Sequence, residues 1–215
     1  MEVECPASHN KASKQTARRV WMLFKVMAAL VVGFYPGSLQ AQPSRSATQI
    51  RIFTPFNTGG LNIGLAVTDR AEGTCMGGSL AAATRPDAWR CSAGNRIYDP
   101  CFENTLGNRN VLACAEPPWT ANVVLLRLTA PLPTNNNRAD RSKTLPWALE
   151  LANGQRCTLL TGATGLIAGM RVNYGCADGS SVVGNIERTQ PLWKVFFQSQ
   201  RSLSLDYTEV VVAWF

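Results

Sequence analysis

The chain has 215 residues, 46% of them hydrophobic, and its 21 lysines and arginines outnumber its 14 aspartates and glutamates to give a net charge of +7. A chain of this length and composition can form one domain with a substantial core. Its only histidine is His9, and its basic residues are mostly scattered singly, which excludes histidine-dependent catalysis beyond the N-terminus and argues against a nucleic-acid-binding surface.

Residues 1–41 are predicted to be a signal peptide. A basic stretch is followed by the apolar run 26–35, and the small residue Ala41 marks the expected cleavage site. An uncleaved membrane anchor is the alternative, but a span requires about 20 apolar residues, and Lys25 and Pro36 bound a shorter run. Translation could also start at Met22. We therefore expect a secreted or periplasmic protein whose only membrane contact is through the signal peptide.

Cleavage after Ala41 would remove His9 and Cys5 and leave 16 basic and 12 acidic residues, a net charge of +4. An even number of cysteines would remain in a protein delivered to an oxidising compartment, which favours disulfides. A zinc cluster is the alternative, but no Cys-x-x-Cys pair occurs and no histidine would remain, so we expect neither a metal site nor a cofactor. The remaining cysteines are Cys75, Cys91, Cys101, Cys114, Cys157 and Cys176.

The pairing of these cysteines is only partly indicated. Cys157 and Cys176 flank one glycine-rich turn, each at the end of a strand-like run, which favours a bridge between them. For the others we favour Cys75 with Cys91 and Cys101 with Cys114, and the remaining pairings stay open. Each bridge should stabilise the fold by about 2–4 kcal/mol, mainly through the unfolded state.

The first half of the exported part contains few regular strand signals. Residues 42–48 are polar and are predicted to be a flexible leader, so that the domain would occupy 49–215. Strand signals follow at 49–53 and 73–83, and most clearly in the apolar, β-branched run 121–128. Between them, four cysteines are interleaved with aromatic, arginine and turn-forming residues, which predicts irregular loops stapled by disulfides.

The second half reads as a series of short strands. Residues 131–144 are a loop, which we interpret as a long surface excursion rather than a boundary between subdomains, because neither half alone has an obvious complete core. Turns are expected at Asn153-Gly154 and Asp178-Gly179. We predict an all-β single domain, an antiparallel sandwich or partly open barrel with irregular disulfide-stapled loops. The strand-like runs are 147–151, 156–160, 170–176, 181–186, 193–197 and 207–215.

A glycine-rich motif at residues 157–169 resembles the phosphate loop of extended short-chain dehydrogenases. Such a loop should open a helix and start a series of alternating strands and helices. Here a strand-like run follows almost at once, and Ala168 stands where the family has its third glycine. We therefore interpret the motif as a glycine-rich turn between two strands.

Several catalytic mechanisms can be excluded from the residues that are present. In the exported part a serine–lysine pair would need Lys143 or Lys194, and no Ser-x-x-Lys motif among residues 42–215 supports one. A pair of carboxylates, as in glycosidases, is the chemistry that remains, and it gives a hydrolase of envelope polysaccharide as the alternative function. Aspartates beside prolines are also common in turns, which favours a structural role. The available carboxylates are Asp87, Asp99, Glu103 and Glu116.

A non-catalytic binding or structural module of the cell envelope fits the sequence better. Aromatic rings could stack on a ligand while arginines meet its carboxylate or phosphate groups, the ligand being an envelope polymer or protein. The competing interpretation is that Trp89 and Tyr98 are core residues beneath the disulfides. A protease-inhibitor-like or purely structural protein also remains open. The candidate binding residues are Trp89, Arg90, Arg96, Tyr98, Asp99 and Trp119, with Arg109 nearby.

Four strings of the sequence resemble an uncharacterised six-cysteine domain of exported bacterial proteins. The resemblance would cover most of the exported part, and it implies an exported single domain without implying an activity or a functional residue. The strings are RPDAWRC at 85–91, NRIYDPCF at 95–102, PWALELANG at 146–154 and LTGATG at 160–165.

Overall fold

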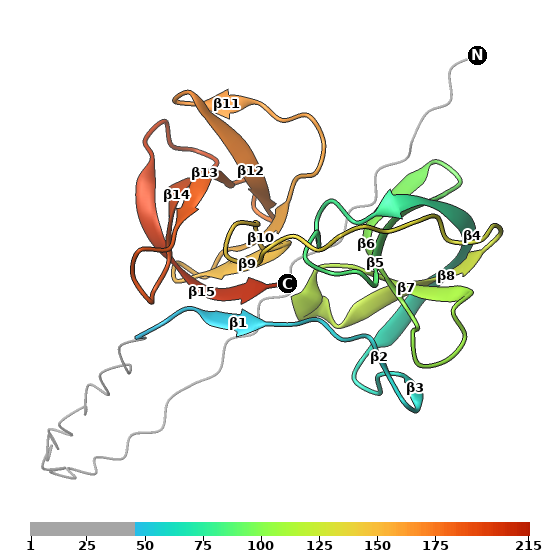
Figure 1. Cartoon of the computed structure of the whole chain (residues 1–215). Helices are drawn as coiled ribbons and strands as arrows, with labels where there is room; N and C mark the ends of the chain where they lie inside the picture. Colours follow the sequence, from blue (N-terminus) through green and yellow to red (C-terminus); the bar gives the residue numbers. More distant parts are fainter. Residues whose placement is uncertain (1–45) are drawn as a thin grey trace, which may run out of the picture. The chain divides into compact units, whose positions relative to one another are not determined.

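The computed structural model describes residues 46–215, which lie within one compact unit that begins at Gln42. The predicted signal peptide and most of the predicted leader lie outside the described residues. The described part is all-β, as predicted, and consists mainly of two barrel-like sheets (Figure 1). Its one helical turn is the 3₁₀ helix η1 (Pro118–Thr120), and no helix of residues 46–215 is long and apolar enough to cross a membrane.

The first barrel is closed by a strand that changes partners along its length. The first part of β4 pairs in parallel with β8, and its last part pairs in antiparallel with β5. Because both neighbours use the same long strand, the five strands form a closed sheet. They are β4 (Ala66–Gly78), β5 (Ala88–Ala93), β6 (Arg96–Glu103), β7 (Val111–Ala115) and β8 (Asn122–Leu128).

The second barrel closes because β15 pairs with β14 at its start and with β9 at its end. Its six strands are β9 (Ala148–Leu151), β10 (Arg156–Leu159), β12 (Met170–Cys176), β13 (Ser181–Glu187), β14 (Lys194–Gln198) and β15 (Asp206–Trp214). Shorter strands complete the fold: β1 (Gln49–Arg51) on β15, β11 (Leu166–Ile167) on β12, and the hairpin of β2 (Phe56–Asn57) and β3 (Gly60–Leu61).

The three disulfides join Cys75 with Cys91, Cys101 with Cys114 and Cys157 with Cys176, which confirms the favoured pairs. In each bridge the two cysteines stand directly opposite each other on neighbouring antiparallel strands. The cysteine-rich region therefore contains more regular structure than the sequence suggested, because β5, β6 and β7 run through it.

The buried residues form three clusters. One fills the second barrel and another, which contains Trp89, Cys101 and Leu126, fills part of the first. The third cluster includes residues of both barrels, with Phe102 from β6 and Trp147 from just before β9. The rings of Phe102 and Trp147 lie 6.4 Å apart, and Phe53 contacts both at 5.4 and 5.8 Å. The two barrels thus share a core.

The described part of the chain is anchored one residue earlier than predicted. The hydroxyl of Thr48 donates a hydrogen bond to the carbonyl of Val210 at 2.7 Å and accepts one from the backbone N–H of Trp193 at 2.8 Å. The backbone N–H of Thr48 also donates to the carbonyl of Pro191. Thr48 therefore belongs to the second barrel, although the sequence places it in the leader.

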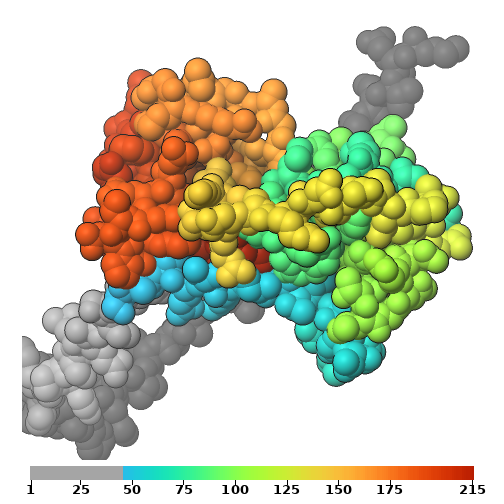
Figure 2. Space-filling model, in the orientation of Figure 1, coloured from blue at the N-terminus to red at the C-terminus, as the bar shows by residue number. Residues whose placement is uncertain are grey.

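The predicted loop 131–144 connects the two barrels. The amide of Asn135 donates hydrogen bonds to the carbonyls of Pro86 and Ala88, both at 2.9 Å, and the amide of Asn137 donates to the carbonyl of Ser79 at 2.8 Å. Figure 2 shows this segment, in yellow, lying across the green first barrel. The loop is thus fastened along the surface by asparagine side chains.

The end of the loop is held by one arginine. Arg188, which follows β13, donates hydrogen bonds from its guanidinium to the carbonyls of Arg141 and Ser142, each at 2.9 Å, and of Thr144 at 2.6 Å. A planar guanidinium suits this arrangement because its fixed fork of donors reaches several acceptors at once. Arg188 therefore attaches the connecting loop to the second barrel.

Replacing Arg188 by alanine is expected to release this loop without unfolding the barrels. Three hydrogen bonds of about 1 kcal/mol each would be lost, so trypsin should cut within 138–143 about tenfold faster than in the wild type. Arg171→Ala is the matched control, because Arg171 binds two carbonyls of a different loop. Mass spectrometry of the fragments identifies the cleavage sites, and equal cleavage rates in both variants would contradict the role of Arg188.

Candidate functional site

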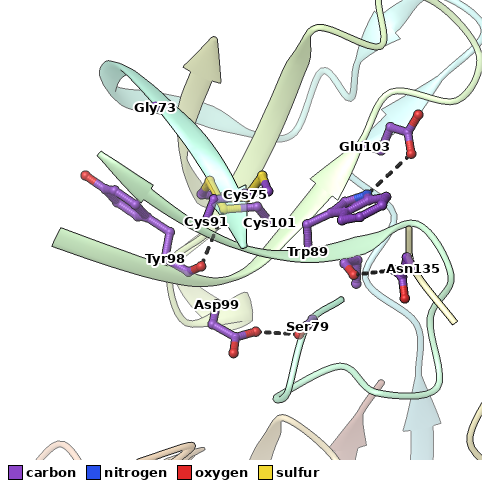
Figure 3. The surroundings of a disulfide bond; sticks show 12 residues. Gly73, Cys75, Ser79, Trp89, Cys91, Tyr98, Asp99, Cys101, Glu103 and Asn135 are labelled. Atoms are coloured by element: carbon purple, nitrogen blue, oxygen red, sulfur yellow. Dashed lines mark hydrogen bonds between the residues drawn. A yellow bond between two sulfur atoms is a disulfide. The ribbon is translucent and has the colours of Figure 1, made fainter. Parts of the chain in front are cut away.

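Trp89, the first residue of the predicted binding groove, is a core residue. Its side chain is 4% exposed and packs in the cluster that contains Cys91 and Cys101. Its indole N–H donates to Glu103 at 3.3 Å, as Figure 3 shows, and Glu103 is also paired with Arg109. The hydrophobic interior of the first barrel needs a large side chain here, and Trp89 is not available for stacking on a ligand.

Asp99 also has a structural role. Its carboxylate accepts a hydrogen bond from the hydroxyl of Ser79 (Figure 3). It also accepts hydrogen bonds from the backbone N–H groups of Leu80, at 3.2 Å, and Ala81, at 3.4 Å. Arg90 lies 3.8 Å from it and is its nearest cation. The Asp99 side chain is only 5% exposed, so it holds the turn after β4 and does not face a ligand.

Burial raises the pKa of Asp99 above its ordinary value, although the hydrogen bonds and Arg90 oppose this shift. Between the unfolded and folded pKa values the folded chain therefore binds a proton that the unfolded chain has lost, and stability falls as the pH rises through this window. The contribution is complete below the unfolded pKa and is lost above the folded pKa. Relative to Asp99→Asn, the wild type should become more stable as the pH falls from 7 towards 4. Urea unfolding of both proteins across this range measures the difference, and a constant difference would contradict the prediction.

The other predicted binding residues lie in separate places. Arg96 stacks over Tyr98, with 5.2 Å from the guanidinium carbon to the ring centroid, at the hairpin of β5 and β6. Tyr98 also packs partly against the cysteine-containing core. Trp119 lies in η1, where Arg156 of the second barrel faces its ring at 5.9 Å. The six residues do not form one groove.

The carboxylates proposed for a hydrolase all have local partners. Asp87 accepts two hydrogen bonds from Arg85, at 2.8 and 2.6 Å. Glu103 is paired with Arg109, and Glu116 accepts a hydrogen bond from Thr68 at 3.1 Å. Each of the four carboxylates, Asp99 included, therefore has a partner within the fold.

The glycine-rich motif forms a turn, as predicted. The chain continues from β10 through a loop into the hairpin of β11 and β12, and no helix follows the glycines. Ala168 and Gly169 make the hairpin turn with φ angles of 50° and 77°. The guanidinium of Arg171 donates hydrogen bonds to the carbonyls of Leu160 and Gly162 at the start of the motif.

Two shallow hollows that the sequence did not reveal lie on the second barrel, and Ala152 lines both; we call them the two lobes of the groove. The backbone N–H of Ala152 donates to the carbonyl of Glu209, which lines the second lobe. The first lobe, of about 220 Å³, is lined by Glu150, Leu151, Ala152, Gly154, Gln155, Arg156 and Val211. The second, of about 290 Å³, is lined by Ala152, Lys194, Tyr207, Thr208 and Glu209.

The second lobe contains an exposed aromatic ring beside a cation. Tyr207 is 58% exposed, and its ring lies 4.3 Å from that of Phe196, its cross-strand neighbour. Lys194 stands opposite Glu209 of β15 and opposite Glu187 of β13. Nevertheless, no carboxylate among residues 46–215 approaches the Lys194 ammonium within ion-pair distance. The lobe thus offers an aromatic face and a cation that can accept an external anion.

The first lobe is bordered by charged and aromatic side chains around Glu150. This carboxylate accepts a hydrogen bond from the indole of Trp214 at 3.1 Å and contacts Arg156 Nε at 3.3 Å and Arg51 at 3.9 Å. Arg51 lies over the ring of Trp214, with 5.3 Å to the centroid. The Arg156 side chain is half exposed, and its guanidinium also faces the ring of Trp119.

Comparisons with protein-family models, with curated proteins and with solved structures found no match for this chain. The resemblance to an exported six-cysteine domain therefore stays a prediction. The groove on the second barrel is the candidate functional site.

Proposed function

We propose that this protein is an exported, non-catalytic binding module of the cell envelope that holds its ligand in the groove of the second barrel. The observation that carries this proposal is the open second lobe, which the exposed ring of Tyr207 and the cation Lys194 both line. The three disulfides are compatible with an oxidising compartment. The predicted signal peptide supports export to the periplasm or the medium.

The contacts and positions of the carboxylates in the groove favour a binding function over hydrolysis. A glycosidase needs two carboxyl groups on either side of the bond that it cleaves, one of them free to donate a proton. In the groove, Glu150 is already engaged by Trp214 and by two arginines, Arg51 and Arg156. The other groove carboxylate, Glu209, lies in the adjoining lobe.

The test is cosedimentation of the purified secreted protein with insoluble cell-wall material, combined with an assay for released reducing sugar. We expect the protein to sediment with the material in a saturable manner without releasing sugar. Release of sugar by the wild type would support the hydrolase instead, and absence of both sedimentation and release would refute a binding role. Intact mass before and after reduction would show whether the chain begins after Ala41 and carries three disulfides.

A further inference from the structure

We propose that the exported protein forms a dimer in which β1 pairs in antiparallel with β1 of a second copy. The pairing is centred on Arg51, so that Ile50 of each copy lies opposite Ile52 of the other. This proposal goes beyond the binding function and does not depend on it. It rests on the backbone groups at the free edge of β1, on the two isoleucine side chains and on the contacts of Arg51.

The backbone groups of Ile50 and Ile52 face the free edge of the sheet. Among residues 46–215, β1 pairs only with β15 (Figure 1). The carbonyl of Arg51 accepts a hydrogen bond from the N–H of Phe215 at 2.9 Å, and the N–H of Phe53 donates to the carbonyl of Phe215 at 3.2 Å. Backbone groups of successive residues point to opposite sides of a strand. Because Arg51 and Phe53 face β15, the N–H and C=O groups of Ile50 and Ile52 face away from it.

The side chains at this edge are apolar and only half covered. Ile50 is 47% exposed and Ile52 is 42% exposed. Residues two apart in an extended segment project from the same face, so the two isoleucines stand next to each other. Apolar side chains beside unpaired backbone groups form a template on which another strand can pair.

The free edge of β4 is, in contrast, protected against such pairing. The register of β4 with β8 shifts between Val67 and Asp69. The carboxylate of Asp69 then accepts a hydrogen bond from the backbone N–H of Arg70 at 2.7 Å. Irregular register and charged side chains are devices by which proteins prevent pairing at an edge. The register of β1 with β15 has no such shift, so the edge of β1 remains suited to a further strand.

A second copy of β1 supplies the groups that this edge lacks. In an antiparallel pair, opposite residues alternate between those that exchange two hydrogen bonds and those that exchange none. With Arg51 on the two-fold axis, Ile50 and Ile52 form hydrogen-bonded pairs with their counterparts, and every outward N–H and C=O of these residues finds a partner. Each isoleucine side chain also faces an isoleucine. A self-complementary patch of this kind is what a two-fold dimer requires.

Arg51 limits the strength of the dimer. The two arginines stand opposite each other at the axis, and like charges in this position destabilise a strand pair. The guanidinium is directed back to its own barrel, where it lies over the ring of Trp214 at 5.3 Å and contacts Glu150 at 3.9 Å. Its charge is thereby partly compensated, and we expect a weak dimer with a dissociation constant of about 0.1 mM.

Sedimentation equilibrium of the exported protein, from about 10 µM to about 1 mM, measures this association. The wild type should pass from monomer to dimer over the range. Ile52→Pro removes an outward N–H without removing a hydrogen bond to β15, and Ile50→Lys places a charge at the edge, so each should weaken dimerisation about tenfold or more. The matched control is Ile97→Lys, which changes an exposed isoleucine of β6 and should dimerise as the wild type. Thermal unfolding verifies that each variant is folded.

Disulfide trapping tests the register. Opposite residues of a pair without hydrogen bonds have Cα atoms about 4.5 Å apart, which lies within the range that a disulfide can bridge. Mild oxidation of Arg51→Cys should therefore yield a covalent dimer that reductant separates. Ile97→Cys is the control and should stay monomeric under the same conditions. Intact mass measures both products.

The outcomes decide between a second copy and other occupants of the edge. A wild type that stays monomeric at about 1 mM, or a dimer that Ile52→Pro and Ile50→Lys leave unchanged, would overturn the proposal. Equal trapping at positions 51 and 97 would do the same. A photo-crosslinking residue at position 50, activated in the producing cells, should give a product of twice the chain's mass. Crosslinking only to a different protein would assign the edge to that partner instead.

Discussion

Replacing Phe102 by alanine is expected to lower the free energy of unfolding by about 3–5 kcal/mol. The ring is fully buried in the core shared by the two barrels, where it contacts Phe53 and Trp147. Arg85 also lies over its face, 4.7 Å from the centroid. Truncation would open a cavity in the core that both barrels share, so the loss includes both transfer and cavity contributions.

The matched control for Phe102 is Ile97→Ala in the same strand. Ile97 is 58% exposed, so its truncation should change stability by less than about 1 kcal/mol. Urea unfolding followed by tryptophan fluorescence, with the disulfides intact, measures both variants. Similar losses in the two would show that the shared core does not carry the stability that we assign to it.

Replacing Gly73 by alanine is expected to cost about 3 kcal/mol, because a side chain at this position has no room. A Cβ would overlap the carbonyl oxygen of Ser92, and would lie 2.9 Å from its carbonyl carbon and 3.0 Å from Cβ of Ala93. Two of these three atoms are backbone and cannot rotate away. Gly73 also marks the point where β4 leaves β8 and begins to pair with β5.

Gly77→Ala tests the same substitution in the same strand without the clash. No atom lies within 4 Å of a Cβ built at Gly77, so this variant should be neutral or slightly stabilised by the reduced freedom of the unfolded chain. The thermal midpoint of Gly73→Ala should fall well below that of Gly77→Ala. Equal midpoints would mean that β4 and β5 can separate without cost.

The strands of the second barrel could be predicted because their burial alternates. In β14, Val195 and Phe197 are buried, whereas Lys194 is exposed and Phe196 partly so, and this pattern is visible in the sequence. The turns at Gly154 and Gly179 adopt the positive φ angles that their glycines suggested. Local sequence thus specified local structure where each strand has one buried face.

Except for β8, the strands of the first barrel were harder to predict because their sequences do not alternate. The first part of β4 is exposed at nearly every position, so no buried face shows in the sequence. β6 contains Pro100, and β5 and β6 carry the polar and turn-forming residues that are typical of loops. These segments are strands because they pair with neighbouring strands and are joined to them by disulfides. Such pairing cannot be inferred from the sequence of one segment alone.

The candidate site could not be predicted for the same reason. Ala152 is far from Lys194 and Tyr207 in the sequence, and it meets them only because β15 pairs with β14 and then with β9. The sequence directed attention to Trp89, where aromatic and arginine residues are dense. Those aromatic residues are concentrated there because they pack around the disulfides inside the first barrel. The groove, in contrast, depends on which residues the pairing of strands brings together.

The placement of the three disulfides has a consequence for how the molecule comes apart. The bridged cysteines are separated by 16, 13 and 19 residues, and each bridge stays within one barrel. The disulfides therefore do not cross the boundary between the barrels, where the main chain and non-covalent contacts, including the packing around Phe102 and Trp147, hold the halves together. We therefore expect denaturant without reductant, or mechanical tension, to separate the two barrels from each other first. The disulfides would still restrict the unfolded chain within each barrel, which would help each barrel to refold.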